Sequence, residues 1–191
     1  MSRFGGQHDF AVSDFMSKVD NLGGVWKKNR FSVEITPPST LRTTVQAATI
    51  NFLAKTISFP AKSFGSTTYR SGGRFGLEVP YETTFEPVSL TMLNTGDHSP
   101  RKFWNSWFEH IQSVDATPGH NYNMQYYKKF IGQIKISQYS EDQTLKATPK
   151  YEIILHEAWP KTISAIELGW ENSDLADFDI DIAYSWWTES T

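Results

Sequence analysis

The chain has 191 residues, of which 15% are aromatic and 20% are charged, enough apolar material for one domain with a substantial core. Its 18 Lys and Arg against 21 Asp and Glu leave a formal net charge of −3, which disfavours a protein that holds nucleic acid by neutralising phosphates. The absence of cysteine excludes disulfide scaffolds, cysteine-ligated zinc and thiol nucleophiles.

The N-terminal segment, residues 1–28, is predicted to be an arm that contains a short helix. Over residues 9–19 the apolar side chains recur at helical spacing, with Phe15 and Met16 among them. The segment lacks the apolar run and the cleavage site of a signal peptide. No stretch approaches the roughly 18 apolar residues of a membrane-spanning helix, so we expect no membrane-spanning segment. Residues 29–191 are predicted to form the main domain.

The first half of this domain is predicted to contain strands and one long hairpin. Residues 30–36 alternate apolar and polar side chains, which indicates a half-buried strand. Residues 49–58 are rich in strand-forming residues and predict a second strand. Residues 57–77 predict a hairpin with its turn at Ser71-Gly72-Gly73, because glycine reaches the positive φ that tight hairpin turns need. Residues 85–92 alternate again and predict a further strand.

An amphipathic helix is predicted over residues 99–112. Ser99 is the expected N-cap, and Pro100 suits the first helical position. One face is apolar, with side chains three and four residues apart: Phe103, Trp104, Trp107, Phe108 and Ile111. We expect this face to pack against the strands as the hydrophobic anchor of the domain.

The C-terminal third is predicted to add strands over residues 131–139, 150–157, 165–170 and 177–187. In the last of these, apolar and polar side chains separate onto opposite faces. The apolar face carries Phe178, Ile180, Ile182, Tyr184 and Trp186, and the polar face carries Asp177, Asp179 and Asp181. Many short strands with one main helix predict a mainly β fold, either a β-sandwich or a small barrel with one flanking amphipathic helix.

No pattern of residues points to catalysis, to a cofactor or to a metal. The five histidines never stand at the spacing of metal ligands, and the chain contains neither a nucleophile elbow nor a phosphate-binding loop. The three aspartates interleave with Ile180 and Ile182, which favours a strand face over a calcium loop. We therefore expect a protein that is not an enzyme.

The C-terminal region has a distinctive order of features in the sequence EAWPKTISAIELGWENSDLADFDIDIAYSWWTE. A strand runs into a Trp159-Pro160 corner, a short strand ends at Trp170 before the turn Glu171-Asn172-Ser173, and a final alternating strand closes with Trp186-Trp187. This order resembles the end of the tail tube proteins of contractile-tailed, myovirus-type bacteriophages. Earlier segments follow the family's order: RFSVEI, KTISFPAKSF, TTYRSGGRF and SPRKFWNSWFEHI. The resemblance covers roughly residues 29–189.

The resemblance implies a subunit of a hexameric ring, and rings that stack into a hollow conduit for DNA ejection inside a contractile sheath. It implies a protein of the virion tail that is assembled in the host cytoplasm. The implied partners are further copies of the chain, the tail sheath protein, the tape measure protein and the baseplate tube initiator, with phage DNA as a transient passenger. Two alternatives stay open: a baseplate-proximal initiator or tube-capping paralogue of the same fold, and a carbohydrate-binding β-sandwich.

Two groups of residues are predicted to serve such a tube. The hairpin is expected to make the contact between stacked rings, with the candidates Tyr69, Arg70, Arg74 and Phe75. The lumen is expected to be acidic, because like charge keeps DNA off the wall whereas a basic wall would bind it. Its lining candidates are Asp177, Asp179 and Asp181, with Glu34 or Glu152. In the competing interpretation, the aspartate face is the solvated exterior of the tube.

Overall fold

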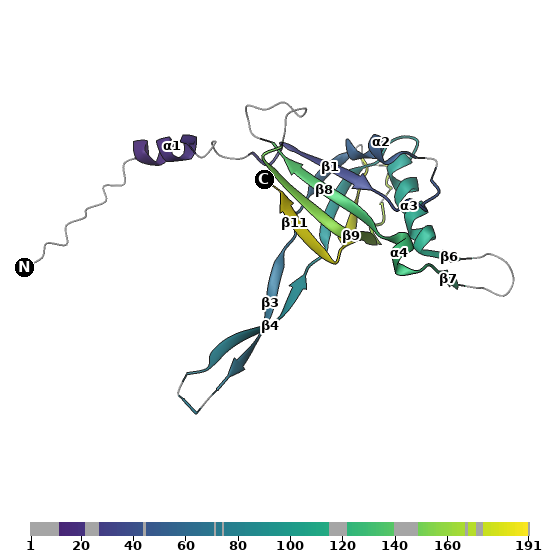
Figure 1. The fold of residues 1–191 in the computed structure, drawn as a ribbon. Coiled ribbons are helices and arrows are strands. Elements are labelled where there is room, and N and C mark those ends of the chain that lie inside the picture. The colour runs from purple at the N-terminus through teal and green to yellow at the C-terminus, as the bar shows by residue number, and fades with distance from the viewer. Residues whose placement is uncertain are drawn as a thin grey trace, which may run out of the picture.

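The computed structural model describes residues 12–21, 27–43, 45–70, 72–73, 75–114, 122–139, 149–166, 168–170 and 174–190. Its elements are α1 (Val12–Asn21), β1 (Phe31–Thr36), α2 (Ala47–Asn51), β2 (Ala54–Ile57), β3 (Lys62–Tyr69), β4 (Leu77–Phe85), β5 (Val88–Leu93), α3 (Ser99–Ile111), β6 (Gln112–Val114), β7 (Tyr122–Met124), α4 (Tyr127–Phe130), β8 (Gly132–Gln138), β9 (Tyr151–Ile163), β10 (Asp177–Ala183) and β11 (Trp186–Ser190). The predicted mainly β fold with one long flanking helix is confirmed (Figure 1).

The strands of the body form one antiparallel sheet that bends into two layers. Its order is β1-β8-β9-β10-β5-β2, with β11 also beside β9. β9 belongs to both layers: its residues up to Ala158 pair with β8 and β11, and residues 159–163 pair with β10. The change of partner occurs next to Glu157, which has a φ of 55°. We call β1, β8, β11 and the first part of β9 sheet A, and β10, β5, β2 and the rest of β9 sheet B.

The sandwich stays open on one side. Among the described strands, β1 ends sheet A and β2 ends sheet B, and these two edges do not pair with each other. Of the two predicted forms, the structure therefore shows an open sandwich and not a closed barrel. The core lies between the sheets and α3, and its largest fully buried side chains include Trp104, Trp107, Phe103 and Phe178.

The helix α3 is the hydrophobic anchor that its spacing predicts. Phe103, Trp104 and Trp107 are fully buried, and Ile111 is buried at the end of the helix. The indole Nε1 of Trp107 donates a 2.8 Å hydrogen bond to the Phe130 carbonyl. The Trp104 Nε1 donates to the Met92 sulfur at 3.0 Å. Both indole N–H groups of α3 therefore have a hydrogen-bond partner, as burial in an apolar core requires.

The predicted cap of this helix is wrong by one residue. Ser99 is the first helical residue, and the N-cap position is taken by His98, whose side chain makes no capping hydrogen bond. His98 has a φ of 57°, a left-handed conformation. The Asp97 carboxylate instead accepts hydrogen bonds from the Ser99 backbone N–H and hydroxyl and from the Thr95 hydroxyl. These bonds, the Ser99 hydroxyl first, hold the pKa of Asp97 well below its usual value.

Two predicted strands are wrong in part or in whole. Within residues 49–58 the chain first completes the helix α2, and only Ala54–Ile57 form a strand. The fully buried Ile50 holds α2 on the core, so tertiary packing decides this segment against its strand propensity. The described residues of 165–170 contain no strand, and Trp170 is fully exposed. The Glu171-Asn172-Ser173 turn lies outside the described residues.

The two C-terminal strands also differ from the prediction. β9 does not end at Trp159-Pro160 but continues through Pro160 to Ile163. The pairing with β10 is irregular here, because Asp181 pairs with Thr162 and Ile182 with Pro160, which leaves one extra residue in β9 beside Pro160. Proline is tolerated in sheets at such bulges. The predicted single strand over residues 177–187 is broken at residues 184–185. Beyond the break the faces exchange: Trp187 packs on the core and Trp186 is 44% exposed.

Candidate assembly surfaces

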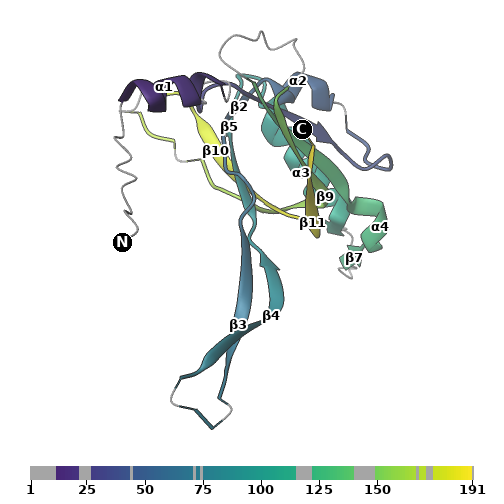
Figure 2. The same cartoon turned by 60° about the vertical axis from the view of Figure 1, so that its left-hand side comes forward.

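A long hairpin of β3 and β4 projects from the body of the molecule (Figures 1 and 2). Its strands pair from Lys62–Phe85 at the base to Tyr69–Leu77 near the tip. Gly72 in the turn has a φ of 65°, which confirms the glycine requirement of the predicted turn. A two-stranded hairpin is marginally stable by itself in water, so a hairpin of this length needs contacts outside its own pair.

One face of the hairpin is apolar. Tyr69 pairs with Leu77 and Thr67 with Val79, and β-strand geometry places all four side chains on the same face. Tyr81 joins them across a bulge, because its ring lies 3.1 Å from the position a Cβ of Gly65 would take. We call Tyr69, Leu77, Val79 and Tyr81 the hairpin stripe. Their exposed fractions of 62%, 66%, 40% and 69% show that the subunit itself does not cover them.

The opposite face of the outer hairpin is polar. Ser66 and Thr68 on β3 share this face with Glu78 on β4, and the Ser66 hydroxyl donates to the Glu78 carboxylate at 3.4 Å. A hairpin that is apolar on one face and polar on the other is typical of a segment that lies on a partner surface with one side. The outer hairpin is therefore suited to docking and not to free solvation.

The predicted contact residues lie around the end of this hairpin. Tyr69 belongs to the hairpin stripe, Arg70 follows it and is exposed, and Phe75 is 89% exposed. Arg74 lies outside the described residues. The prediction missed Leu77, Val79 and Tyr81, although their alternation in the sequence LEVPY was a signal for a one-sided apolar strand.

The predicted lumen aspartates form a row on the outer face of sheet B. The Asp177 carboxylate accepts a 2.5 Å hydrogen bond from Lys55 on β2, and this bond raises the pKa of the Lys55 ammonium. Asp179 accepts a 2.7 Å hydrogen bond from the Thr91 hydroxyl, and Asp181 pairs in register with Ser89. We call Asp177, Asp179 and Asp181 the aspartate row. Lys55 pairs with Asp177 alone, so the three carboxylates outnumber this one cation and the face keeps a net negative charge.

Glu34 and Glu152 do not join this row but lie on sheet A. Lys135 on β8 lies between them, with its Nζ 3.1 Å from Glu152 and 3.7 Å from Glu34. The hydrogen bond to Glu152 is the main cause that raises the pKa of Lys135. The structure thus separates the predicted lumen residues into an acidic row on one sheet and a partly compensated triad on the other.

In the described part of the chain, the His, Asp and Glu side chains form no group that could hold a metal ion. None of its helices is long and apolar enough to cross a membrane.

Comparison with known proteins gives consistent results. A family model described as "Phage tail tube protein" matches residues 26–190. The tail tube protein of Serratia phage KSP90 is 24% identical over 174 residues, which cover 91% of this chain and 93% of that protein. The fold is similar to that of a chain in the PVC sheath-tube complex of an extracellular contractile injection system in the extended state. The TM-score is 0.60 at 13% sequence identity, and the match covers 91% of this chain and 96% of the other. A chain of the anti-feeding prophage baseplate gives a TM-score of 0.59 at 12% identity, covering 84% and 92%.

Proposed function

This chain belongs to the phage tail tube protein family and is a tail tube subunit, and on that premise we propose that its copies form hexameric rings that stack into a hollow tube. The exposed hairpin stripe is the observation that carries the proposal. A monomer that leaves Tyr69, Leu77, Val79 and Tyr81 in water on one projecting face has a surface that needs a partner. A neighbouring copy in the tube supplies that partner.

The sheet edges support a ring. Among the described strands, β1, β2 and β11 each have a pairing partner on one side only. An unprotected strand edge invites pairing with another chain, and a closed ring removes such edges by joining each subunit to the next. A head-to-tail contact that closes after six copies gives a ring with two different faces, and the upper face of one ring can stack on the lower face of the next.

The hairpin is well placed to join one ring to another. It continues β2 and β5 of sheet B and extends beyond the body, so a subunit can reach past the boundary of its own ring (Figure 2). We propose that the hairpin stripe, together with Arg70, Arg74 and Phe75, contacts a subunit of the adjacent ring. The polar face with Thr68 and Glu78 then stays in water.

The bore is proposed to be lined by the aspartate row. The hairpin that is proposed to link rings forms a sheet of its own but continues β2 and β5 of sheet B along the chain, so we propose that the strands of sheet B run from ring to ring and that their outer face follows the tube. On that face Asp179 and Asp181 form no ion pair with the described side chains, and Lys55 pairs directly with Asp177 alone, which suits a wall that phosphates must slide past. Glu34 and Glu152, which share Lys135, lie on the other sheet and are proposed to face away from the bore.

The remaining features of the proposed role concern partners. We propose a contractile tail, in which the tube lies within a sheath protein, starts on a baseplate initiator, encloses a tape measure protein and passes DNA during ejection. We propose no catalytic role, and we propose that residues 1–28 form an arm separate from the tube domain at 29–191. An initiator or capping role is disfavoured, because the relative matched over 93% of its length is a tail tube protein.

Native mass spectrometry of the purified chain tests the ring directly. The subunit mass is 21.8 kDa, so a ring gives a species of six times this mass, and stacked rings give multiples of that species. A distribution of monomers and dimers that does not change with concentration would contradict the proposal.

A further inference from the structure

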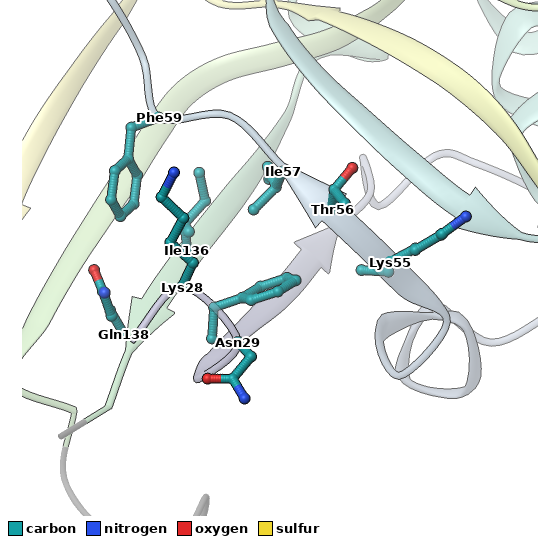
Figure 3. A pocket seen from close by; sticks show the side chains of 10 residues that line it. Lys28, Asn29, Lys55, Thr56, Ile57, Phe59, Ile136 and Gln138 are labelled. Carbon is teal, nitrogen blue, oxygen red and sulfur yellow. The ribbon is translucent and has the colours of Figure 1, made fainter. Parts of the chain in front are cut away.

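A groove opens along the side of the sandwich where sheets A and B fail to meet. It has a volume of about 770 Å³, within the roughly 300–1,000 Å³ of pockets that bury a ligand or side chains. Its walls come from β1, β2 and β8 and from the chain on either side of them. The lining side chains that matter here are Phe31, Ile57, Phe59, Ile136, Gln138 and the two lysines Lys28 and Lys55 (Figure 3).

The groove has an apolar floor with cations at its margin. Ile136 is fully buried, Phe31 and Ile57 are half-buried, and Phe59 is 49% exposed although it contacts Tyr151 edge to face. Lys28 and Lys55 are exposed at the margin. Figure 3 shows Phe59 and Gln138 on one side and Thr56 and Lys55 on the other, with Lys28 between them.

One polar atom in the wall of the groove is unsatisfied. The side-chain oxygen Oε1 of Gln138 is buried and has no hydrogen-bond partner among the described residues. Because this oxygen is not exposed to the groove, the apolar floor determines what the groove can bind. An occupant with an apolar surface would therefore fit.

The helix α1 has the complementary chemistry. Val12 and Met16, one turn apart, are 69% and 61% exposed, and Phe15 beside them is 51% exposed, so α1 presents an apolar stripe to solvent. A helix of 10 residues is too short to be stable by itself in water, and it needs a surface to lie on. Asp14, Lys18 and Asp20 give it a net acidic charge, opposite to that of Lys28 at the margin of the groove, whereas Lys55 is already paired with Asp177.

We propose that the groove of each subunit is filled by the α1 helix of a neighbouring copy, an inference that rests on the proposed ring. Figure 1 shows α1 well apart from both sheets of its own subunit, so it extends toward a neighbour. A donor helix and an acceptor groove at different places on one chain make a head-to-tail contact, the kind that closes into a ring. The end of the hairpin is a poor occupant, because Arg70 would meet Lys28 with like charge.

Disulfide cross-linking tests this contact, since the chain contains no cysteine of its own. Met16→Cys and Phe59→Cys are prepared as separate variants, mixed, assembled and oxidised. The mixture should give a cross-linked dimer that neither variant gives alone. The double variant should give a ladder that reaches the full ring. A mixture of Met16→Cys with Lys161→Cys, an exposed site on β9, is the matched control and should not cross-link.

Other results would overturn the contact. Tubes that form but give no cross-link from the mixture exclude α1 as the occupant. A double variant that cross-links only within one chain shows that α1 returns to its own groove. Cross-linking of Phe59→Cys with Trp170→Cys instead shows that the exposed loop around Trp170 fills the groove. Failure of the unmodified chain to form rings contradicts the proposed function itself, and electron microscopy of the same sample identifies that case.

A second measurement follows the energetics of the contact. Val12→Asp with Met16→Asp places two carboxylates in an apolar groove and should raise the concentration needed for assembly by about tenfold or more. Lys18→Glu changes the net charge by the same amount at the edge of the apolar stripe and is the control. Equal assembly by the double variant and the unmodified chain would overturn the inference.

Discussion

The indole rings of Trp104 and Trp107 stack face to face in the core, with centroids 5.5 Å apart and planes inclined by 1°. The ring of Phe103 meets both of them edge on, at 5.5 Å and 6.0 Å. Because Trp104 also bonds to Met92 on β5, and Trp107 bonds to Phe130 next to β8, this aromatic group connects α3 to both sheets. The stability of the open sandwich therefore depends on α3.

Trp107→Ala should destabilise the subunit strongly. The substitution removes a fully buried indole and leaves the Phe130 carbonyl without its donor, so we expect a loss of about 3–5 kcal/mol in the free energy of unfolding. Urea unfolding followed by circular dichroism measures it. Trp170→Ala, at a fully exposed tryptophan, is the control and should change the free energy by less than about 0.5 kcal/mol. Equal stability of the two variants would show that the Trp107 site can be emptied without penalty.

Gly132→Ala should destabilise the same region through overpacking. A Cβ at this position would lie 2.5 Å from the Thr36 carbonyl oxygen and 2.8 Å from the Trp107 ring, so β1, β8 and α3 would have to separate. We expect a loss of about 1–3 kcal/mol. Urea unfolding followed by circular dichroism measures this loss, and Gly96→Ala, where a Cβ would meet nothing within 4 Å, should be close to neutral in the same experiment. A neutral Gly132→Ala would mean that the close approach is not maintained in solution.

The hairpin stripe should be needed for assembly but not for folding. Leu77→Asp with Val79→Asp places charge on the apolar face, and we expect a folded subunit that no longer sediments as tubes. Ser66→Asp with Thr68→Asp adds the same charge to the polar face and should assemble. Arg70→Glu with Arg74→Glu should give rings that stack poorly. If the Leu77 and Val79 variant forms normal tubes, the hairpin stripe is not part of the contact between rings.

The aspartate row should affect DNA passage and not assembly. Asp179→Lys places a cation on the proposed wall of the bore, where it would attract phosphates, so a phage with this change should eject its genome more slowly. Glu34→Lys on sheet A makes the same charge change on the other face and should eject at the normal rate. Fluorescence of a DNA-binding dye during triggered ejection measures both rates. If only Glu34→Lys is slow, sheet A lines the bore.

The alternation of residues predicts much of these surfaces, because side-chain direction in a strand follows local sequence. The period of two residues predicts the aspartate row, and the period of about 3.6 residues predicts the apolar face of α3. The glycine at residue 72 predicts the turn of the hairpin. The break in the last predicted strand at residues 184–185 could not be predicted, because the alternation continues through it from Ile182 to Trp186. Only pairing with different parts of β9 shows that β10 and β11 are separate.

Contacts between strands that are distant in the sequence could not be predicted either. Lys135 lies between Glu34 and Glu152 because β1 and β9 pair with β8 on its two sides, and strand order is not a local property. The groove has the same origin, since it exists where the edges of β1 and β2 remain apart. The exposure of Leu77 and Tyr81 likewise depends on the hairpin leaving the body, a property of the whole fold.

Electron cryomicroscopy of the assembled chain tests the central claim most directly. We predict a hollow tube of stacked sixfold rings, in which the hairpin stripe is covered by a subunit of the adjacent ring and Asp177, Asp179 and Asp181 point into the bore. A map in which single copies stay dispersed at high concentration, or in which the hairpin of each subunit extends into solvent, would contradict the account.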